Sequence, residues 1–146
     1  MGLAKCAPVD HLEAVHTSLV IAVFRVLTWC CVCFLAILSL WPGRGLGFLF
    51  VMPELNTLRT GLPGSFEHFI AYAGSAAIGM LGYGMSRGTM PIIGAFWAYA
   101  GILEYLQHFS LARHPSIVDF AASVMGALCG GLAVALLSRR PTDQPS

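Results

Sequence analysis

Charged and amide side chains gather at one place in the sequence, between two long apolar segments. Glu104 and Gln107 are three residues apart, so on a helix they share one face. Arg113 and Ser116 follow on a turn, and Asp119 opens the next apolar run, where a carboxylate suits the positive end of a helix dipole. Arginine can pair with either carboxylate through a planar fork, so we expect Arg113 to bind Glu104 or Asp119.

The segments that must position these residues are too apolar for a soluble domain. The 146 residues are 57% hydrophobic and only 10% charged, and the mean hydropathy is +0.75. Soluble domains carry roughly 25% charged residues. The composition therefore predicts an integral membrane protein. The formal net charge of +1 gives no reason to expect nucleic acid as a partner.

Four apolar runs are each long enough to cross a hydrocarbon core of about 30 Å. They cover roughly residues 19–41, 66–85, 91–109 and 117–137. The predicted fold is thus all-α, a polytopic membrane protein in which a bundle of four transmembrane helices forms one domain over residues 1–146. Arg25 lies in the first run and is expected to extend its guanidinium to the nearer headgroups. A cleaved signal peptide is the alternative for this run, but the apolar stretch is too long.

The direction of the chain predicts which polar residues meet. Four spans place both termini on one side, and the distribution of arginines favours the cytoplasm for that side. The end of the third span and the starts of the second and fourth then lie together at the opposite face. A polar cluster is expected there, made of Glu67, His68, Glu104, Gln107, Arg113, Ser116 and Asp119.

This cluster has three possible uses: it fastens helix ends together, it binds a ligand, or it carries out acid–base chemistry through Glu104, Asp119 and His68. Glu104 and His108 are four residues apart, which would suit a metal ion, but no HExxH motif accompanies them. Ser65, Ser110 and Ser116 lack a Gly-x-Ser-x-Gly context, which argues against any of them as a nucleophile. We therefore assign no catalytic residue, no metal ligand and no cofactor. The cysteines are interpreted as small apolar packing residues: Cys6, Cys30, Cys31, Cys33 and Cys129.

At the polar cluster the sequence resembles the VanZ-like family of small bacterial membrane proteins. That family has a His-Phe motif opening one helix, Glu-x-x-Gln closing the next, a turn with an arginine, and an aspartate starting the last helix. The matching positions are His68-Phe69, Glu104-Tyr-Leu-Gln107, Arg113 and Asp119. The resemblance covers roughly residues 63–137. Many members carry Asn four residues after the Asp, where this chain has Ser123.

The resemblance implies a four-helix protein of the bacterial inner membrane, linked through the family's founding member to low-level resistance to the glycopeptide teicoplanin. It implies no particular reaction. Two functions therefore stay open. The first is an envelope protein whose cluster binds a membrane lipid or a lipid-linked envelope component by its headgroup at the outer face. The second is a membrane-embedded hydrolase or transferase that uses Glu104, Asp119 and His68.

Overall fold

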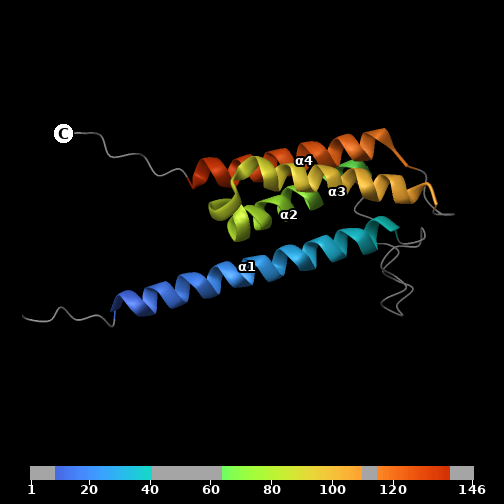
Figure 1. Ribbon diagram of the computed structural model, residues 1–146. Helices are drawn as coiled ribbons and strands as arrows, with labels where there is room; N and C mark the ends of the chain where they lie inside the picture. The colour runs from blue at the N-terminus through green and yellow to red at the C-terminus, as the bar shows by residue number, and fades with distance from the viewer. Residues whose placement is uncertain (1–8, 41–63, 110–114, 139–146) are drawn as a thin grey trace, which may run out of the picture.

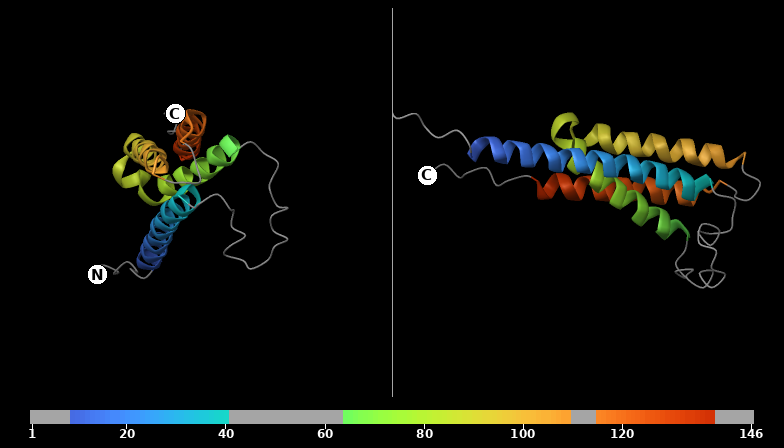
Figure 2. Two further views of the ribbon diagram at one scale, coloured as in Figure 1. Left: turned by 90° about the vertical axis from the view of Figure 1, so that its right-hand side faces the viewer. Right: turned by 90° about the horizontal axis from the view of Figure 1, so that it is seen from below.

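The computed structural model describes residues 9–40, 64–109 and 115–138. These residues form four helices (Figure 1): α1 Val9–Leu40, α2 Gly64–Arg87, α3 Thr89–Gln107 and α4 Ile117–Leu137. The all-helical class predicted from the sequence is confirmed for this part of the chain. Helices α2, α3 and α4 lie together, and α1 crosses α2 and diverges from the others towards its own N-terminus (Figure 2).

Helix α1 begins earlier than the predicted first span, at Val9. The sequence between Val9 and Leu40 contains no glycine or proline, so nothing interrupts the helix before the apolar run. Hydroxyl groups near its N-terminus donate hydrogen bonds to carbonyl groups of the same helix. Thr17 Oγ1 donates to the Glu13 carbonyl at 2.9 Å, and Ser18 Oγ donates to the Val15 carbonyl at 2.8 Å. The polar segment and the apolar run are therefore one continuous element.

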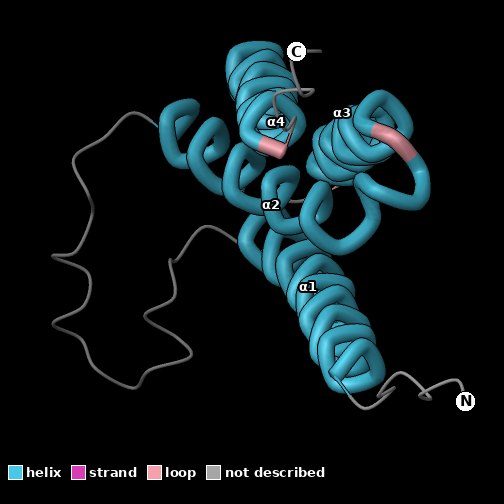
Figure 3. Tube along the Cα trace, turned by 90° about the vertical axis from the view of Figure 1, so that its left-hand side faces the viewer, coloured by secondary structure: helices cyan, strands magenta, loops and turns pink. Residues whose placement is uncertain are grey.

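A single residue, Gly88, connects α2 to α3 (Figure 3). Its φ of 82° lies in the left-handed region that side chains disfavour. Its N–H donates to the Gly84 carbonyl at 3.0 Å, which closes the last turn of α2. Pro91 lies in the first turn of α3, where its missing N–H is tolerated. The connection is shorter than the gap between the predicted runs 66–85 and 91–109, because α2 stays helical through Arg87 and α3 begins at Thr89.

Helices α2 and α4 form the most extensive contact between two helices. A Cβ added at Gly126 would overlap the carbonyl oxygen of Phe69, and one added at Gly130 would overlap that of Ala73. The two glycines are four residues apart and lie on one face of α4, so the backbones approach along a line. The absence of a side chain at these two glycines therefore permits the close packing of α4 on α2.

Two helical segments are long and apolar enough to cross a membrane: Glu13–Leu40 within α1, and α4. The sequence of α2 is rich in glycine, alanine and serine, and α3 carries Pro91, Glu104 and Gln107. These residues lower the hydropathy of α2 and α3 without preventing helix formation. The structure thus bears out four helices, two of them with the length and composition of membrane spans.

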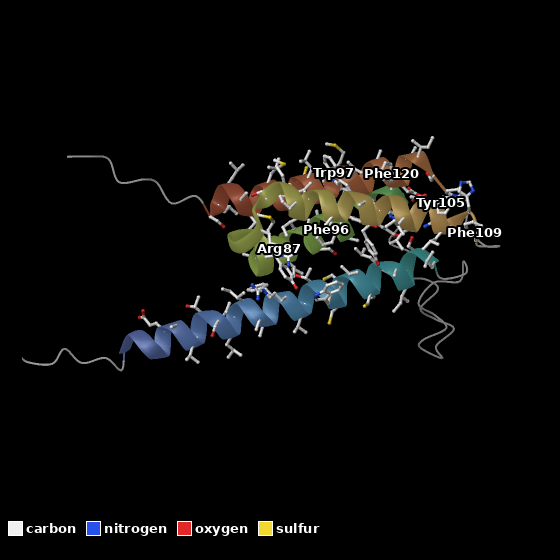
Figure 4. All side chains as sticks on the ribbon, viewed as in Figure 1. Arg87, Phe96, Trp97, Tyr105, Phe109 and Phe120 are labelled. Carbon is white, nitrogen blue, oxygen red and sulfur yellow. The ribbon has the colours of Figure 1, made fainter. Side chains whose placement is uncertain are left out.

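Side chains on α1 are distributed unlike those of a helix in water. The face that packs on the other helices buries Thr28, Leu35 and Ser39. The outward face carries large apolar side chains such as Val26 and Trp29, which are 62% and 63% exposed. Figure 4 shows side chains along α1 that point away from the rest of the bundle. The buried face of α1 thus includes two hydroxyl side chains, while its outward face carries large apolar ones.

Candidate functional site

The start of α2, the end of α3 and the start of α4 lie at one end of the bundle, next to the last turn of α1 (Figure 1). The alternating directions of the helices produce this arrangement. Several of the polar residues expected to meet do so, through a chain of hydrogen bonds that joins α3, α4 and α2. We call this chain of bonds the Glu104–His68 network; it comprises Glu104, Ser116, Asp119, Ser123 and His68.

Glu104 on α3 holds the N-terminus of α4. Its Oε2 accepts a hydrogen bond from the backbone N–H of Ser116 at 3.0 Å. Ser116 is the N-cap of α4, and its Oγ accepts from the backbone N–H of Asp119 at 3.3 Å. Both N–H groups lack a partner within the helix, so these bonds satisfy donors that would otherwise be unpaired. A carboxylate at this point also interacts favourably with the helix dipole.

The cap of α4 is an incomplete capping box. In the complete motif, a carboxylate or amide three residues after the cap accepts from the cap's own N–H, a place that Asp119 could fill. Here Glu104 takes that bond from a neighbouring helix. Among the residues that the structure describes, the carboxylate oxygens of Asp119 make no hydrogen bond or ion pair. The Asp119 side chain is therefore available to a ligand or to the adjoining turn.

Ser123 links Asp119 to His68. Its Oγ donates to the Asp119 carbonyl at 2.9 Å and lies 3.4 Å from His68 Nδ1. A hydroxyl has one proton, so with that proton on the Asp119 carbonyl the imidazole must be the donor to Ser123. A neutral His68 then carries its proton on Nδ1 and keeps Nε2 as a hydrogen-bond acceptor. The same bond makes Ser123 a poor nucleophile, because its proton is directed at a backbone carbonyl.

Gln107 does not join this network, contrary to its expected place in the cluster. Its side chain is buried, and Nε2 donates to Ser39 Oγ at 2.6 Å and to the Ser39 carbonyl at 3.2 Å. Residues three apart on a helix differ by about 60° around its axis, which is enough to face a different neighbour. Glu104 faces α4, whereas Gln107 faces the end of α1. Gln107 therefore fastens α3 to α1.

The remaining predicted residues are placed as follows. Glu67 is exposed in the first turn of α2. Arg113 lies outside the described residues, so its pairing with Glu104 or Asp119 stays a prediction. Two serines were not predicted as members of the cluster. Ser39 contacts Gln107, and Ser123 contacts His68. Ser123 was recognisable as the residue one turn after Asp119 on the same helix face.

No metal centre is formed by the part of the chain that the structure describes. Its histidine, cysteine, aspartate and glutamate side chains nowhere form a group of three or more that could hold a metal ion. His108 is exposed at the end of α3, and its ring meets Tyr105 edge-on with 6.5 Å between centroids.

Comparison with known proteins leaves the geometry as the main evidence. No protein-family model, no curated protein and no solved structure matches this chain. The resemblance to the VanZ-like family therefore depends on the residues quoted for it. Two features of the structure bear on the function, namely the outward apolar faces and the Glu104–His68 network.

Proposed function

We propose that this chain is a VanZ-like protein of the bacterial inner membrane, with four membrane spans and both termini in the cytoplasm. In this proposal the Glu104–His68 network lies at the extracytoplasmic face and binds the headgroup of a lipid or of a lipid-linked cell-wall component. Occupation of that site contributes to resistance against glycopeptides of the teicoplanin type.

The observation that carries the proposal is the outward apolar surface around an interior that also buries polar side chains. Large apolar side chains are exposed along the outer helices, including Leu19 and Val26 on α1 and Ile117, Met125 and Leu136 on α4. Soluble monomers rarely expose contiguous apolar patches of more than a few hundred Å². Buried positions meanwhile include Thr28, Ser39, Ser75, Gln107 and Ser123. Lipid around the bundle accounts for both facts, because polar groups must be satisfied inside it.

The kind of headgroup follows from the groups that the network leaves available. Asp119 offers carboxylate oxygens without a partner among the described residues, and the His68 Nε2 is an acceptor in the neutral ring. Both accept hydrogen bonds. The site therefore suits a headgroup that presents ammonium, amide or hydroxyl donors, as amine-bearing lipids and cell-wall precursors do.

The enzyme alternative receives less support. A general acid–base pair needs two groups that are free to exchange protons with a substrate. Of the three residues that this alternative names, Glu104 already accepts from a backbone N–H through Oε2, which leaves Asp119 and His68. A binding role uses the network as it stands.

The test measures teicoplanin susceptibility of a bacterial host that expresses the chain, with the amount of protein in the membrane fraction measured in parallel. Glu104→Gln and His68→Gln should insert normally and lose the protection. Glu13→Gln and His108→Gln are the matched controls, because both parent side chains are exposed outside the network. Full protection in both network variants would overturn the proposed site. Loss of membrane protein in step with loss of protection would assign the network a structural role only.

A further inference from the structure

Two arginines converge on one tyrosine at the end of the bundle opposite the Glu104–His68 network. The guanidinium carbon of Arg25 on α1 lies 5.2 Å from the centre of the Tyr83 ring, and that of Arg87 on α2 lies 5.8 Å from it. Trp29 Nε1 donates to the Tyr83 hydroxyl at 3.1 Å. Arg87, at the last turn of α2, extends towards α1 (Figure 4). The chain positions of these residues gave no indication that they meet.

Close approach of the two helices creates this pair of arginines. A Cβ at Gly82 would lie 3.0 Å from the backbone nitrogen of Arg25, so the glycine lets α1 cross directly over α2. The Gly82 carbonyl accepts from Arg25 Nε at 3.1 Å, which orients the guanidinium. The Arg25 side chain is thereby held against α2, and its expected reach to the nearer headgroups stays a prediction.

Both arginines are exposed, so their guanidinium donors are within reach of a ligand. No carboxylate among the side chains that the structure describes forms an ion pair with either arginine. A guanidinium has five N–H donors, and Arg25 uses one of them on Gly82. The remaining N–H groups lie in one plane, and two neighbouring N–H groups can donate to two oxygens of the same phosphate. The Tyr83 ring stabilises both cations but does not neutralise them.

An apolar cavity of about 350 Å³ adjoins Arg87, between α1, α2 and α3. Arg87 and Tyr83 line its polar edge. Its apolar lining includes Val32, Ile92 and Phe96, and the Phe96 ring packs closely on Gly79. Small-molecule sites usually measure roughly 300–1,000 Å³ and combine an apolar lining with a few polar groups at fixed positions. An amphiphile could place an anionic head at the arginines and an apolar chain in the cavity.

We propose that the cavity binds an acyl chain of an anionic phospholipid whose phosphate is held by Arg25 and Arg87. The inference rests on the membrane insertion proposed above and adds a second site at the other end of the bundle. Free phosphate would use the arginines but leave the cavity empty. A zwitterionic lipid would bring an ammonium group next to two guanidinium groups. With the termini in the cytoplasm, the site lies at the cytoplasmic leaflet, where anionic lipids attract basic residues.

The experiment is native mass spectrometry of the full chain in detergent, titrated with phosphatidylglycerol or with phosphatidylcholine of the same acyl chains. We expect wild type to retain phosphatidylglycerol more tightly. Arg87→Gln should weaken that retention by about tenfold, since a charge-assisted hydrogen bond is lost. Arg25→Gln should act in the same direction, and the Arg87→Lys variant should keep part of the preference because it keeps the charge.

Matched alanines on α3 test the cavity itself. Ala95 lines it and Ala98 does not, although both are exposed positions. Ala95→Phe should weaken retention of both lipids, whereas Ala98→Phe should behave as wild type. Glycerol 3-phosphate, which has the head without the chains, should compete poorly, and effective competition would show binding of phosphate alone.

Two results would overturn the inference. One is an Arg87→Gln variant, with unchanged helicity and elution volume, that prefers phosphatidylglycerol as strongly as wild type does. The other is equal lipid retention by the Ala95→Phe and Ala98→Phe variants. Membrane insertion is scored separately by alkaline extraction of the membrane fraction. A chain that inserts but shows no arginine-dependent retention refutes this inference alone, whereas a chain released by alkali refutes the proposed function as well.

Discussion

The carboxylate of Glu104 accepts a hydrogen bond from the backbone N–H of Ser116, with 3.0 Å between Oε2 and N. Because Ser116 is the N-cap of α4, this contact makes a side chain of α3 part of the cap of the next helix. It also takes the place that Asp119 would fill in a complete capping box. One hydrogen bond therefore joins two helices and releases the Asp119 carboxylate.

The first prediction concerns that bond. Glu104→Ala should lower the free energy of unfolding by about 1–3 kcal/mol, because the Ser116 N–H loses its acceptor in a partly buried place. Glu104→Gln keeps an acceptor oxygen and should cost less. Denaturation in detergent micelles measures both variants, with Glu13→Ala as an exposed control. Equal losses in the alanine and glutamine variants would show that the charge, and not the acceptor, stabilises α4.

The second prediction concerns the contact of Gln107 with Ser39, which joins the ends of α3 and α1. Gln107→Ala and Ser39→Ala should each destabilise the protein, and the double variant should be less destabilised than the sum. The expected coupling is about 0.5–3 kcal/mol. Combining Gln107→Ala with Thr28→Ala provides the control, because the Thr28 hydroxyl donates to the Phe24 carbonyl within α1. That pair should be additive.

The third prediction uses two glycines with opposite surroundings. Gly130→Ala should destabilise the protein by about 1–3 kcal/mol, since the new methyl group would overlap the Ala73 carbonyl and push α4 away from α2. Gly74→Ala meets nothing within 4 Å and should stabilise α2 by about 0.5–1 kcal/mol. Thermal unfolding in detergent measures both the expected loss of stability and the expected gain. A tolerated alanine at Gly130 would contradict the close packing of α2 on α4.

The fourth prediction tests the proposed orientation. Reporter fusions after Gly88 and Ser146 should be cytoplasmic, and fusions after Thr60 and Arg113 should be extracytoplasmic. The physical reason is the excess of arginine on the side of the termini. Alkaline phosphatase and green fluorescent protein give opposite signals on the two sides, so each position is scored twice. Cytoplasmic signals after Thr60 and Arg113 would reverse the orientation.

The sequence by itself determined the helical class and the order of the helices, because apolar runs and helix breakers act locally. It also placed Glu104 and Asp119 at the same end of the bundle, since short connections between helices force alternating directions. The N-terminal extension of α1 was harder to predict, because a polar helix without glycine or proline carries no apolar period of its own.

Only the tertiary structure decided which neighbour each side chain faces. Gln107 binds Ser39 while Glu104 binds Ser116, although both lie on nearly the same face of α3. Arg25 and Arg87 each lie over the Tyr83 ring although they belong to different helices and are far apart in the sequence. Such contacts depend on the rotation and crossing of whole helices, which close backbone approach at Gly82 and Gly130 sets. No local pattern in the sequence encodes that rotation, because it results from packing all the helices at once.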